Sequence, residues 1–362
     1  MQDCALQVCQ ARPLLGGLGG AVGGPGPRLE APDQSSSFTQ TFLRGILTSI
    51  DSKDPVVANA WLETLLDAID LLPAEVIKQE ITGMAASKAS ISQPPASRLA
   101  AAKMLGKLAT KLDQQSVRQE VLPSCLALCQ DGETEVRTCM CRHLALVARG
   151  AGLELTKSAV LPVLVELSND ESAEVRLAAV EAVAQLLSLL DDDICNSTIV
   201  PLVIKSCEQA RTLEDLSLPV IARHLGRLCH GLSPNLSPEQ KVWFVAYYQQ
   251  LAKLGSSGGS GEVGPSLSPM PDLVPRPTPP TGQDKTEKFV ECRQACAYNL
   301  PGMLLFTGAN NFAESLFSTL CELATDPAAR VRRTLAASLH ELIKIVGSRQ
   351  VPGLCSNIEA QK

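Results

Sequence analysis

Apolar residues along much of the chain recur at helical spacing. Val175, Ala179 and Val183, for example, share one face of a helix with 3.6 residues per turn. Comparable patterns run through residues 38–254 and 286–347, and short polar segments interrupt them. The pattern predicts an all-α protein built from amphipathic helices.

The helical pattern repeats with a fixed period. Three prolines that each follow Leu or Val lie 39 residues apart, and arginines keep the same interval. The prolines are Pro123, Pro162 and Pro201, and the arginines are Arg98, Arg137 and Arg176, with Arg293 and Arg332 as a later pair. A period of this length is typical of an α-solenoid, in which each unit buries its apolar face against its neighbours. We expect two helices per unit, the first starting at the proline, where a first helical turn tolerates it.

A polar turn is the most specific local signal. It reads Asp-x4-Val-Arg and occurs at Asp131 to Arg137, Asp170 to Arg176 and Asp326 to Arg332. This turn between two amphipathic helices, after a Leu-Pro dipeptide, resembles the HEAT repeat. The resemblance implies stacked antiparallel helix pairs in an armadillo-like superhelix. We expect Asp from one turn to lie against Arg from the next, as a structural ladder.

Composition divides the chain into five parts. Residues 1–37 are rich in Gly and end in three serines, and residues 255–285 are rich in Gly, Ser and Pro. Such segments bury too little apolar surface to order themselves. The sequence predicts a disordered segment over 1–37, a repeat array over 38–254, a linker over 255–285, further repeats over 286–347 and a tail over 348–362. Roughly six units are expected.

The sequence predicts the start of one helix from a capping signal. Ser237, Pro238 and Gln240 match an N-cap, the first helical position and the third residue of a capping box. The helix should reach about Leu254. It carries a cluster of aromatic residues, Trp243, Phe244, Tyr247 and Tyr248. Packing inside a solenoid layer is the favoured interpretation, and docking of a partner through Trp243 and Tyr247 is the alternative.

The charge pattern bears on partners. A net charge of −6 offers no attraction to nucleic acid, and no apolar run is long enough for a membrane span. Residues 131–193 carry a net charge of −7, whereas 326–362 carry +3. Four acidic residues near the turns are candidate partner contacts, although a solvated surface is the favoured interpretation for them: Glu133, Glu135, Glu171 and Glu174.

The chain holds little that suggests catalysis. Its 13 cysteines lie mostly within helical patterns, where a thiol behaves as a small apolar group, and this usage favours a reducing, cytoplasmic location. Cys292 and Cys296 do not complete a zinc site, and the cysteines near an exposed His143 alternate around a helix. No nucleophile turn, phosphate loop or dinucleotide fingerprint is present. The sequence therefore predicts no enzyme, no metal and no cofactor.

Several stretches resemble one family within the HEAT proteins. They are Asn59–Leu66, Cys129–Arg142, Gly152–Ser158 and Leu228–Leu232. Together they are similar to the regulatory subunit 4 family of serine/threonine protein phosphatase 4, with this chain as a partial-length relative whose first 37 residues do not match the family's helical start. The resemblance implies a non-catalytic, cytoplasmic subunit that binds the phosphatase 4 catalytic subunit. A generic HEAT adaptor for transport or cytoskeletal cargo is the alternative.

Overall fold

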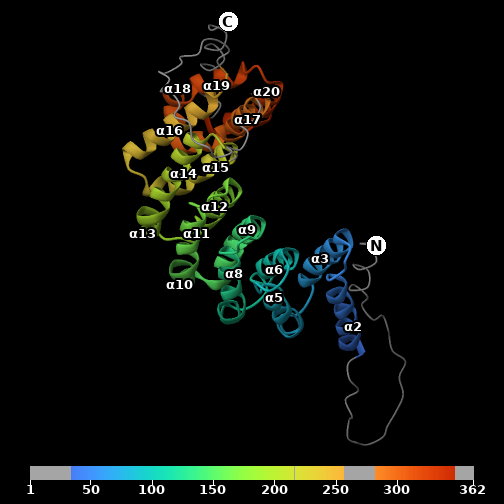
Figure 1. Cartoon of the computed structure of the whole chain (residues 1–362). Coiled ribbons are helices and arrows are strands. Elements are labelled where there is room, and N and C mark those ends of the chain that lie inside the picture. Colours follow the sequence, from blue (N-terminus) through green and yellow to red (C-terminus); the bar gives the residue numbers. More distant parts are fainter. Residues whose placement is uncertain (1–33, 216, 257–281, 347–362) are drawn as a thin grey trace, which may run out of the picture.

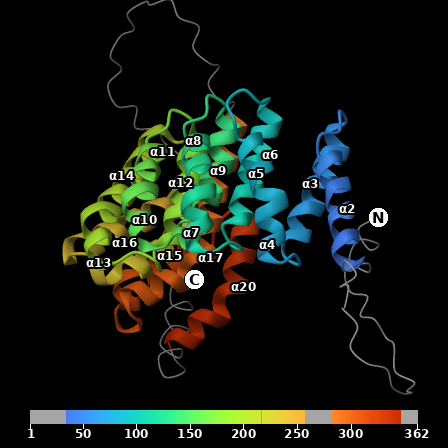
Figure 2. The same cartoon turned by 90° about the horizontal axis from the view of Figure 1, so that it is seen from below.

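The computed structural model describes residues 34–215, 217–256 and 282–346, where it shows helices and no strand. The helices form seven consecutive antiparallel pairs within these ranges, one more than the pattern suggested. Figures 1 and 2 show the pairs stacked side by side along a curved path. The predicted all-α solenoid is confirmed.

The first helices of the pairs are mostly segmented. They are α2 (Gln34–Ser49), α4 with η1 and α5 (Ala74–Ile77, Lys78–Thr82, Gly83–Lys88), α7 with η2 and α8 (Gln114–Ser116, Val117–Val121, Leu122–Cys129), α10 with η3 and α11 (Leu153–Leu155, Thr156–Val160, Leu161–Leu167), α13 with η4 and α14 (Asp192–Ile194, Cys195–Ile199, Val200–Leu213), α16 (Pro238–Lys253), and α18 with α19 (Phe312–Ser315, Phe317–Ala324).

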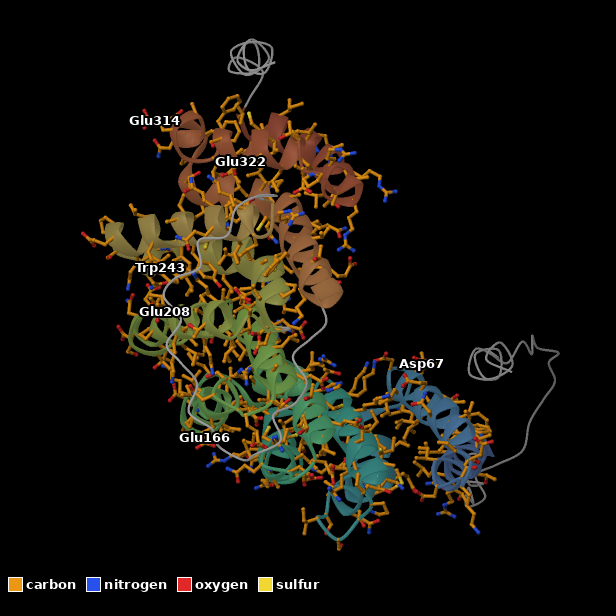
Figure 3. All side chains as sticks on the ribbon, turned by 45° about the horizontal axis from the view of Figure 1, so that its top comes forward. Asp67, Glu166, Glu208, Trp243, Glu314 and Glu322 are labelled. Carbon is orange, nitrogen blue, oxygen red and sulfur yellow. The ribbon has the colours of Figure 1, made fainter. Side chains whose placement is uncertain are left out.

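The second helices are longer and lie against one another. They are α3 (Pro55–Ile69), α6 (Pro95–Leu108), α9 (Thr134–Ala151), α12 (Ala173–Leu186), α15 (Ser217–Leu232), α17 (Gly282–Thr307) and α20 (Ala329–Val346). Short 3-10 turns, η5 (Ser233–Asn235) and η6 (Ala309–Asn311), join some of the elements. Figure 3 shows α9, α12, α15 and α17 on the inner side of the arc, with the first helices outside.

The prolines of the repeat lie in the first turns of α8, α11 and α14, as the sequence pattern suggested, but each of these helices continues a helical segment that begins earlier. The first helix of the third pair begins at Gln114 and reaches Pro123 only after the π-helical turn η2. Proline inside a helix lacks an N–H and crowds the carbonyl four residues earlier, and a widened π turn relieves both problems. The four π turns start at Lys78, Val117, Thr156 and Cys195, again 39 residues apart. Met84 follows the first of them at the place of the proline, so the π turn is a property of the repeat.

Small side chains explain how the second helices pack so closely. Ala101, Ala145 and Ala179 of α6, α9 and α12 are fully buried, as are Leu105 and Leu144, and these second helices contact one another in sequence order. Each large apolar side chain buried in this way contributes on the order of 1.5–3 kcal/mol. The apolar face that predicted the helices is therefore the face that holds the repeats together.

The helix after Ser237 begins as predicted. Ser237 Oγ accepts a hydrogen bond from the Gln240 N–H, the Gln240 side chain accepts one from the Ser237 N–H, and α16 runs from Pro238 to Lys253. This capping box satisfies N–H groups that have no partner within the helix. The sequence-based prediction of this element is confirmed.

The composition-based boundaries differ slightly from the helix ends. α2 begins at Gln34, inside the segment predicted to be disordered, and α17 begins at Gly282, inside the predicted linker. Most of the two segments predicted to be low in order, and the predicted tail, lie outside the described residues, at 1–33, 257–281 and 347–362. The linker falls between the two helices of one pair, and α17 packs on α15 beyond it. None of the helices in the described ranges is both long and apolar enough to cross a membrane.

Candidate interaction surfaces of the repeat array

Arginine and aspartate side chains connect successive turns of the array. Arg98 Nε and Nη2 donate to both carboxylate oxygens of Asp131, at 2.6 and 2.8 Å. Arg137 binds Asp170 in the same two-pronged way, at 2.9 and 3.1 Å. Paired N–H groups of a planar guanidinium fix a carboxylate in direction as well as distance. Each such pair therefore sets how one repeat sits on the next.

Two further pairs continue this series. Arg176 Nη2 binds Asp215, and Arg293 binds Asp326, with Nε 2.6 Å from Oδ2. We call the four pairs the Arg–Asp ladder: Arg98–Asp131, Arg137–Asp170, Arg176–Asp215 and Arg293–Asp326. The side chains of Arg293 and Asp326 are only 3% and 2% exposed. Because a buried charge without a partner is costly, each rung depends on both of its members.

The same residues also shape their own turn. Arg137 Nη1 donates to the main-chain carbonyl of Asp131 at 2.8 Å, and the Asp131 carboxylate accepts from the Glu133 N–H at 2.9 Å. Arg176 and Asp170 form the equivalent carbonyl contact. The turn motif recurs because a single Arg closes its own turn with one nitrogen and reaches the next repeat with the others.

Electrostatics keep the rungs ionised. Burial by itself would raise the pKa of Asp131, but hydrogen bonds from Arg98 and from the Glu133 N–H hold that pKa below its ordinary value of 3.8. Burial and the hydrogen bonds from Arg137 and Ser172 act on Asp170 in the same way, and its pKa is also lowered. Both carboxylates are thus charged at neutral pH, as a salt bridge requires.

The direction of the ladder differs from the sequence-based expectation. Arg of one turn pairs with Asp of the following turn, whereas the expected order was Asp of one turn with Arg of the next. Asp131 therefore pairs with Arg98 and not with an arginine beyond it. Arg332 closes its turn through the Asp326 carbonyl, and it has no ion pair among the described residues.

Sequence reasoning named Arg98 and Arg293 only as period markers and missed Asp215. The interval from Arg to its Asp is 33 residues in three rungs but 39 in the rung of Asp215, because α14, which precedes Asp215, is longer than α8 and α11. A local signal was present: Asp215 accepts from the N–H of Ser217, two residues later, as Asp131 does from Glu133. An Asp-x-Ser search at the turn would have found it.

The four candidate acidic residues lie on the ridge formed by the turns. Glu133, Glu135, Glu171 and Glu174 are all exposed. Glu135 and Glu174 lie in the first turns of α9 and α12, where a negative charge also favours the helix dipole. Glu171 is 3.9 Å from Arg137 Nη2, yet its side chain is 91% exposed. We call these four residues the acidic ridge, and their carboxylates point to solvent beside the ladder.

The aromatic cluster of α16 is mainly a packing feature. Tyr247 is 3% exposed, and its hydroxyl donates to the Cys207 carbonyl at 2.9 Å. Tyr248 is fully buried and donates to the Cys296 carbonyl. A side chain enclosed in this way cannot reach a partner, so Tyr247 is removed from the candidate contacts. Trp243 is partly exposed at the outer edge of the arc and stacks on Tyr247 at 5.3 Å (Figure 3).

The cysteines and His143 lie in the packed layers. Burial raises the pKa of Cys129 and of Cys292 to about 12 in each case, so both thiols stay neutral. His143 is half-buried against Gly106, not exposed as the sequence pattern suggested, and its Nδ1 lies 2.7 Å from the Cys139 carbonyl. The tight approach of α9 to α6 at Gly106 explains the difference, since an added Cβ there would meet the imidazole.

Exposed ion pairs cross the inner face between second helices. Lys103 Nζ of α6 lies 2.9 Å from Glu63 of α3, and Arg142 Nε of α9 lies 3.6 Å from Glu181 of α12. Lys107 also reaches Asp70 at 2.5 Å. The pair of Arg142 and Glu181 links the same two repeats as the rung of Arg137 and Asp170, whereas Lys103 and Lys107 link α6 to the repeat before it. The side chains of these pairs are between 24% and 54% exposed.

Comparisons with known proteins agree with the repeat architecture. The HEAT repeat family matches residues 160–190. The karyopherin Kap121p bound to the extreme C-terminus of the protein phosphatase Cdc14p is similar in structure, with a TM-score of 0.59, 14% identity and coverage of 88% of this chain and 30% of that one. Yeast importin-beta, Kap95p, gives a TM-score of 0.53 at 14% identity, over 90% of this chain and 44% of that one. At such identities the likeness concerns the fold alone.

The solenoid of paired helices, its turn ladder and the family match together define a HEAT-repeat protein. Serine/threonine-protein phosphatase 4 regulatory subunit 4 from human is 41% identical over 312 residues, which are 86% of this chain and 34% of that protein. The mouse protein of the same name is 42% identical over 308 residues, 85% of this chain and 34% of the relative. The chain is thus a relative of phosphatase 4 regulatory subunit 4, and it spans about a third of the length of these relatives.

Proposed function

We propose that this chain is a non-catalytic regulatory subunit that binds the catalytic subunit of serine/threonine protein phosphatase 4 in the cytoplasm. The observation that carries the proposal is the 41% identity to phosphatase 4 regulatory subunit 4 over 86% of the chain. A weaker similarity supports it, because rat phosphatase 4 regulatory subunit 1 is 36% identical over 103 residues, 25% of this chain and 10% of that protein. The alternative, a HEAT adaptor for transport or cytoskeletal cargo, gains no support from the karyopherin likeness, which concerns the fold alone.

The acidic ridge is the surface we propose for the phosphatase. Its members extend from turns that the ladder fixes in place, as the bond between the Asp131 carboxylate and the Glu133 N–H illustrates. Rigid turns present charges in a fixed register along the array. Exposed charges at the rim of an interface mainly raise the association rate and make it sensitive to salt. The ridge would accordingly guide a basic surface of the catalytic subunit.

The test is capture of purified phosphatase 4 catalytic subunit on the immobilised chain at low salt. Changing Glu133, Glu135, Glu171 and Glu174 together to Lys should weaken capture while the helical circular dichroism signal is unchanged. The matched control changes four exposed acidic residues of the outer helices to Lys: Glu75, Glu154, Glu208 and Glu314. Equal capture by both variants would remove the ridge as the interface, and no capture by the original chain would remove the proposed partner. Phosphatase activity of the chain alone would contradict its non-catalytic role.

A further inference from the structure

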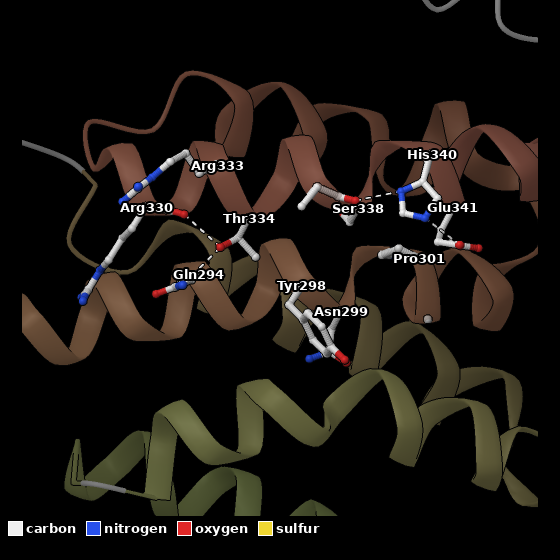
Figure 4. A pocket seen from close by; sticks show the side chains of 12 residues that line it. Gln294, Tyr298, Asn299, Pro301, Arg330, Arg333, Thr334, Ser338, His340 and Glu341 are labelled. Carbon is white, nitrogen blue, oxygen red and sulfur yellow. Dashed lines mark hydrogen bonds and ion pairs between the residues drawn. The ribbon is translucent and has the colours of Figure 1, made fainter.

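A groove lies along the inner face at the C-terminal end of the described array. Between α17 and α20 it has a volume of about 660 Å³, and Tyr298, Arg330 and Arg333 are among the residues that line it (Figure 4). A second hollow of about 610 Å³ shares Tyr298 and Arg330 and extends to Arg223 and Arg227 of α15. Hollows of this size accommodate several side chains of a ligand.

Positive charge without a partner gathers in this groove. Arg223, Arg227 and Arg333 are exposed, and within the described parts of the chain none of them forms an ion pair. Arg223 and Arg227 are four residues apart on α15 and therefore share one face of the helix. The inner face nearer the N-terminus differs, because Lys103 and Arg142 there are paired across helices with Glu63 and Glu181.

The groove also offers apolar and hydrogen-bonding surface. Tyr298 is 67% exposed and stands between the two hollows, and Gln294 Nε2 donates to Thr334 Oγ1 on the wall formed by α17 and α20 (Figure 4). Exposed tyrosine is a common anchor in protein recognition, since its ring is rigid and its hydroxyl is polar. Arginines that flank a tyrosine suit a peptide that carries carboxylates together with apolar and polar side chains.

We propose that the groove between α15, α17 and α20 binds an acidic peptide segment of a partner protein, with Arg223, Arg227 and Arg333 contacting its carboxylates and Tyr298 packing on its backbone. A nucleic acid fits less well, because Glu291 and Glu341 line the same groove and would repel a continuous row of phosphates. A peptide can place its separate carboxylates beside the arginines and avoid the glutamates.

The groove is distinct from the surface proposed for the phosphatase. The acidic ridge projects from the turns before α9 and α12, whereas the groove is formed by the sides of α15, α17 and α20. The two surfaces also have opposite charge. One chain could therefore hold a catalytic subunit and an acidic segment of another protein at the same time, and each contact can be lost without the other.

The test is fluorescence anisotropy with the full chain and a labelled 12-residue peptide containing Glu, Asp and two leucines, at low and moderate salt. The groove variant changes Arg223, Arg227 and Arg333 to Glu. The control variant makes the same charge change at exposed positions of the outer helices, Arg118, Lys205 and Arg211. We expect the groove variant to bind at least about tenfold more weakly and the control to bind as the original chain does.

Three further measurements sharpen this test. A peptide with Gln and Asn in place of Glu and Asp should lose most of its affinity, and Tyr298→Ala should weaken binding with the charge unchanged. The acidic-ridge variant should bind the peptide normally, which separates this proposal from phosphatase capture. The proposal is overturned if the groove and control variants bind alike, if the neutral peptide binds as well, or if a 12-nucleotide single strand binds more tightly than the acidic peptide.

Discussion

The turns and the inner face of this array both use ion pairs to join neighbouring repeats, but in different surroundings. Arg293 and Asp326 of the ladder are almost completely enclosed, at 3% and 2% exposure. Lys103 and Glu63 of the inner face are 28% and 48% exposed. Water screens the second pair and lets both side chains move, whereas the first is held by two parallel hydrogen bonds.

The difference shows that ion pairs of the same chemical type have two different roles in one solenoid. A buried pair fixes geometry, because losing one member leaves a charge without water or a partner. An exposed pair contributes little to stability and can exchange its partner for a ligand. The repeat thus keeps its rigid contacts at the turns and its adaptable charges on the inner face, where the groove is located.

The largest expected effect comes from breaking a rung. Asp326→Ala leaves Arg293 buried without its carboxylate and should lower the free energy of unfolding by about 3–5 kcal/mol. Chemical denaturation measures it. Replacing Arg293 and Asp326 together by Leu should cost clearly less than Asp326→Ala alone, since no buried charge remains. A loss for Asp326→Ala below about 1 kcal/mol would show that the rung is screened like a surface pair.

A smaller effect is expected where two repeats meet through close packing and not through charge. A Cβ added at Gly226 of α15 would lie 2.7 Å from Asn299 Oδ1 of α17, and the Asn299 amide already donates to the Ala222 carbonyl at 3.0 Å. Gly226→Ala should therefore destabilise the chain by about 1 kcal/mol or more, despite the better helix propensity of Ala.

Gly83→Ala is the matched control for this packing effect. Gly83 lies in α5 with no atom within 4 Å of an added Cβ, so the change should stabilise the chain by about 0.5–1 kcal/mol. Thermal melts of both variants measure the difference. Equal and favourable shifts for the two glycines would show that α15 and α17 can separate at little cost.

The exposed pair should contribute least to stability. A double-mutant cycle on Lys103 and Glu63 isolates their interaction, and we expect a coupling of about 0.2–1 kcal/mol that disappears in 1 M salt. The same cycle on Arg137 and Asp170 should give a larger coupling that persists in salt. A coupling for Lys103 and Glu63 as large as that of the ladder pair would remove the contrast between the two regions.

The final prediction concerns proton binding beside the groove. Burial lowers the pKa of His224 from its ordinary 6.5, Glu181 opposes the shift, and Arg223 and Arg227 add to it. The folded state thus binds this proton less readily than the unfolded chain, so stability should fall as the pH drops through 6.5. An NMR titration should show the pKa of His224 rising when Arg223 and Arg227 become Gln. An unchanged pKa would mean that the charges of Arg223 and Arg227 do not affect the protonation of His224.

Much of the fold follows from local sequence alone. Apolar spacing predicts the helices, the Asp-x4-Val-Arg turn locates the reversals at Asp131, Asp170 and Asp326, and Ser237 with Gln240 marks the start of α16. These signals are reliable because each depends on residues within one turn or one helix. The four acidic residues near the turns could likewise be placed on the surface from sequence.

Other features depend on contacts between distant residues, and only the tertiary structure decided them. The partner of Arg176 is Asp215, at an interval that the repeat does not set. Tyr247 is buried, and its hydroxyl donates to the Cys207 carbonyl of another helix. The groove is made by α15, α17 and α20. In the sequence, residues 257–281 lie between α15 and α17. Periodicity determines which residues face a neighbouring repeat, but the stacking of the helices determines which charges find a partner there and which, like Arg223 and Arg333, are left without an ion pair in the described array.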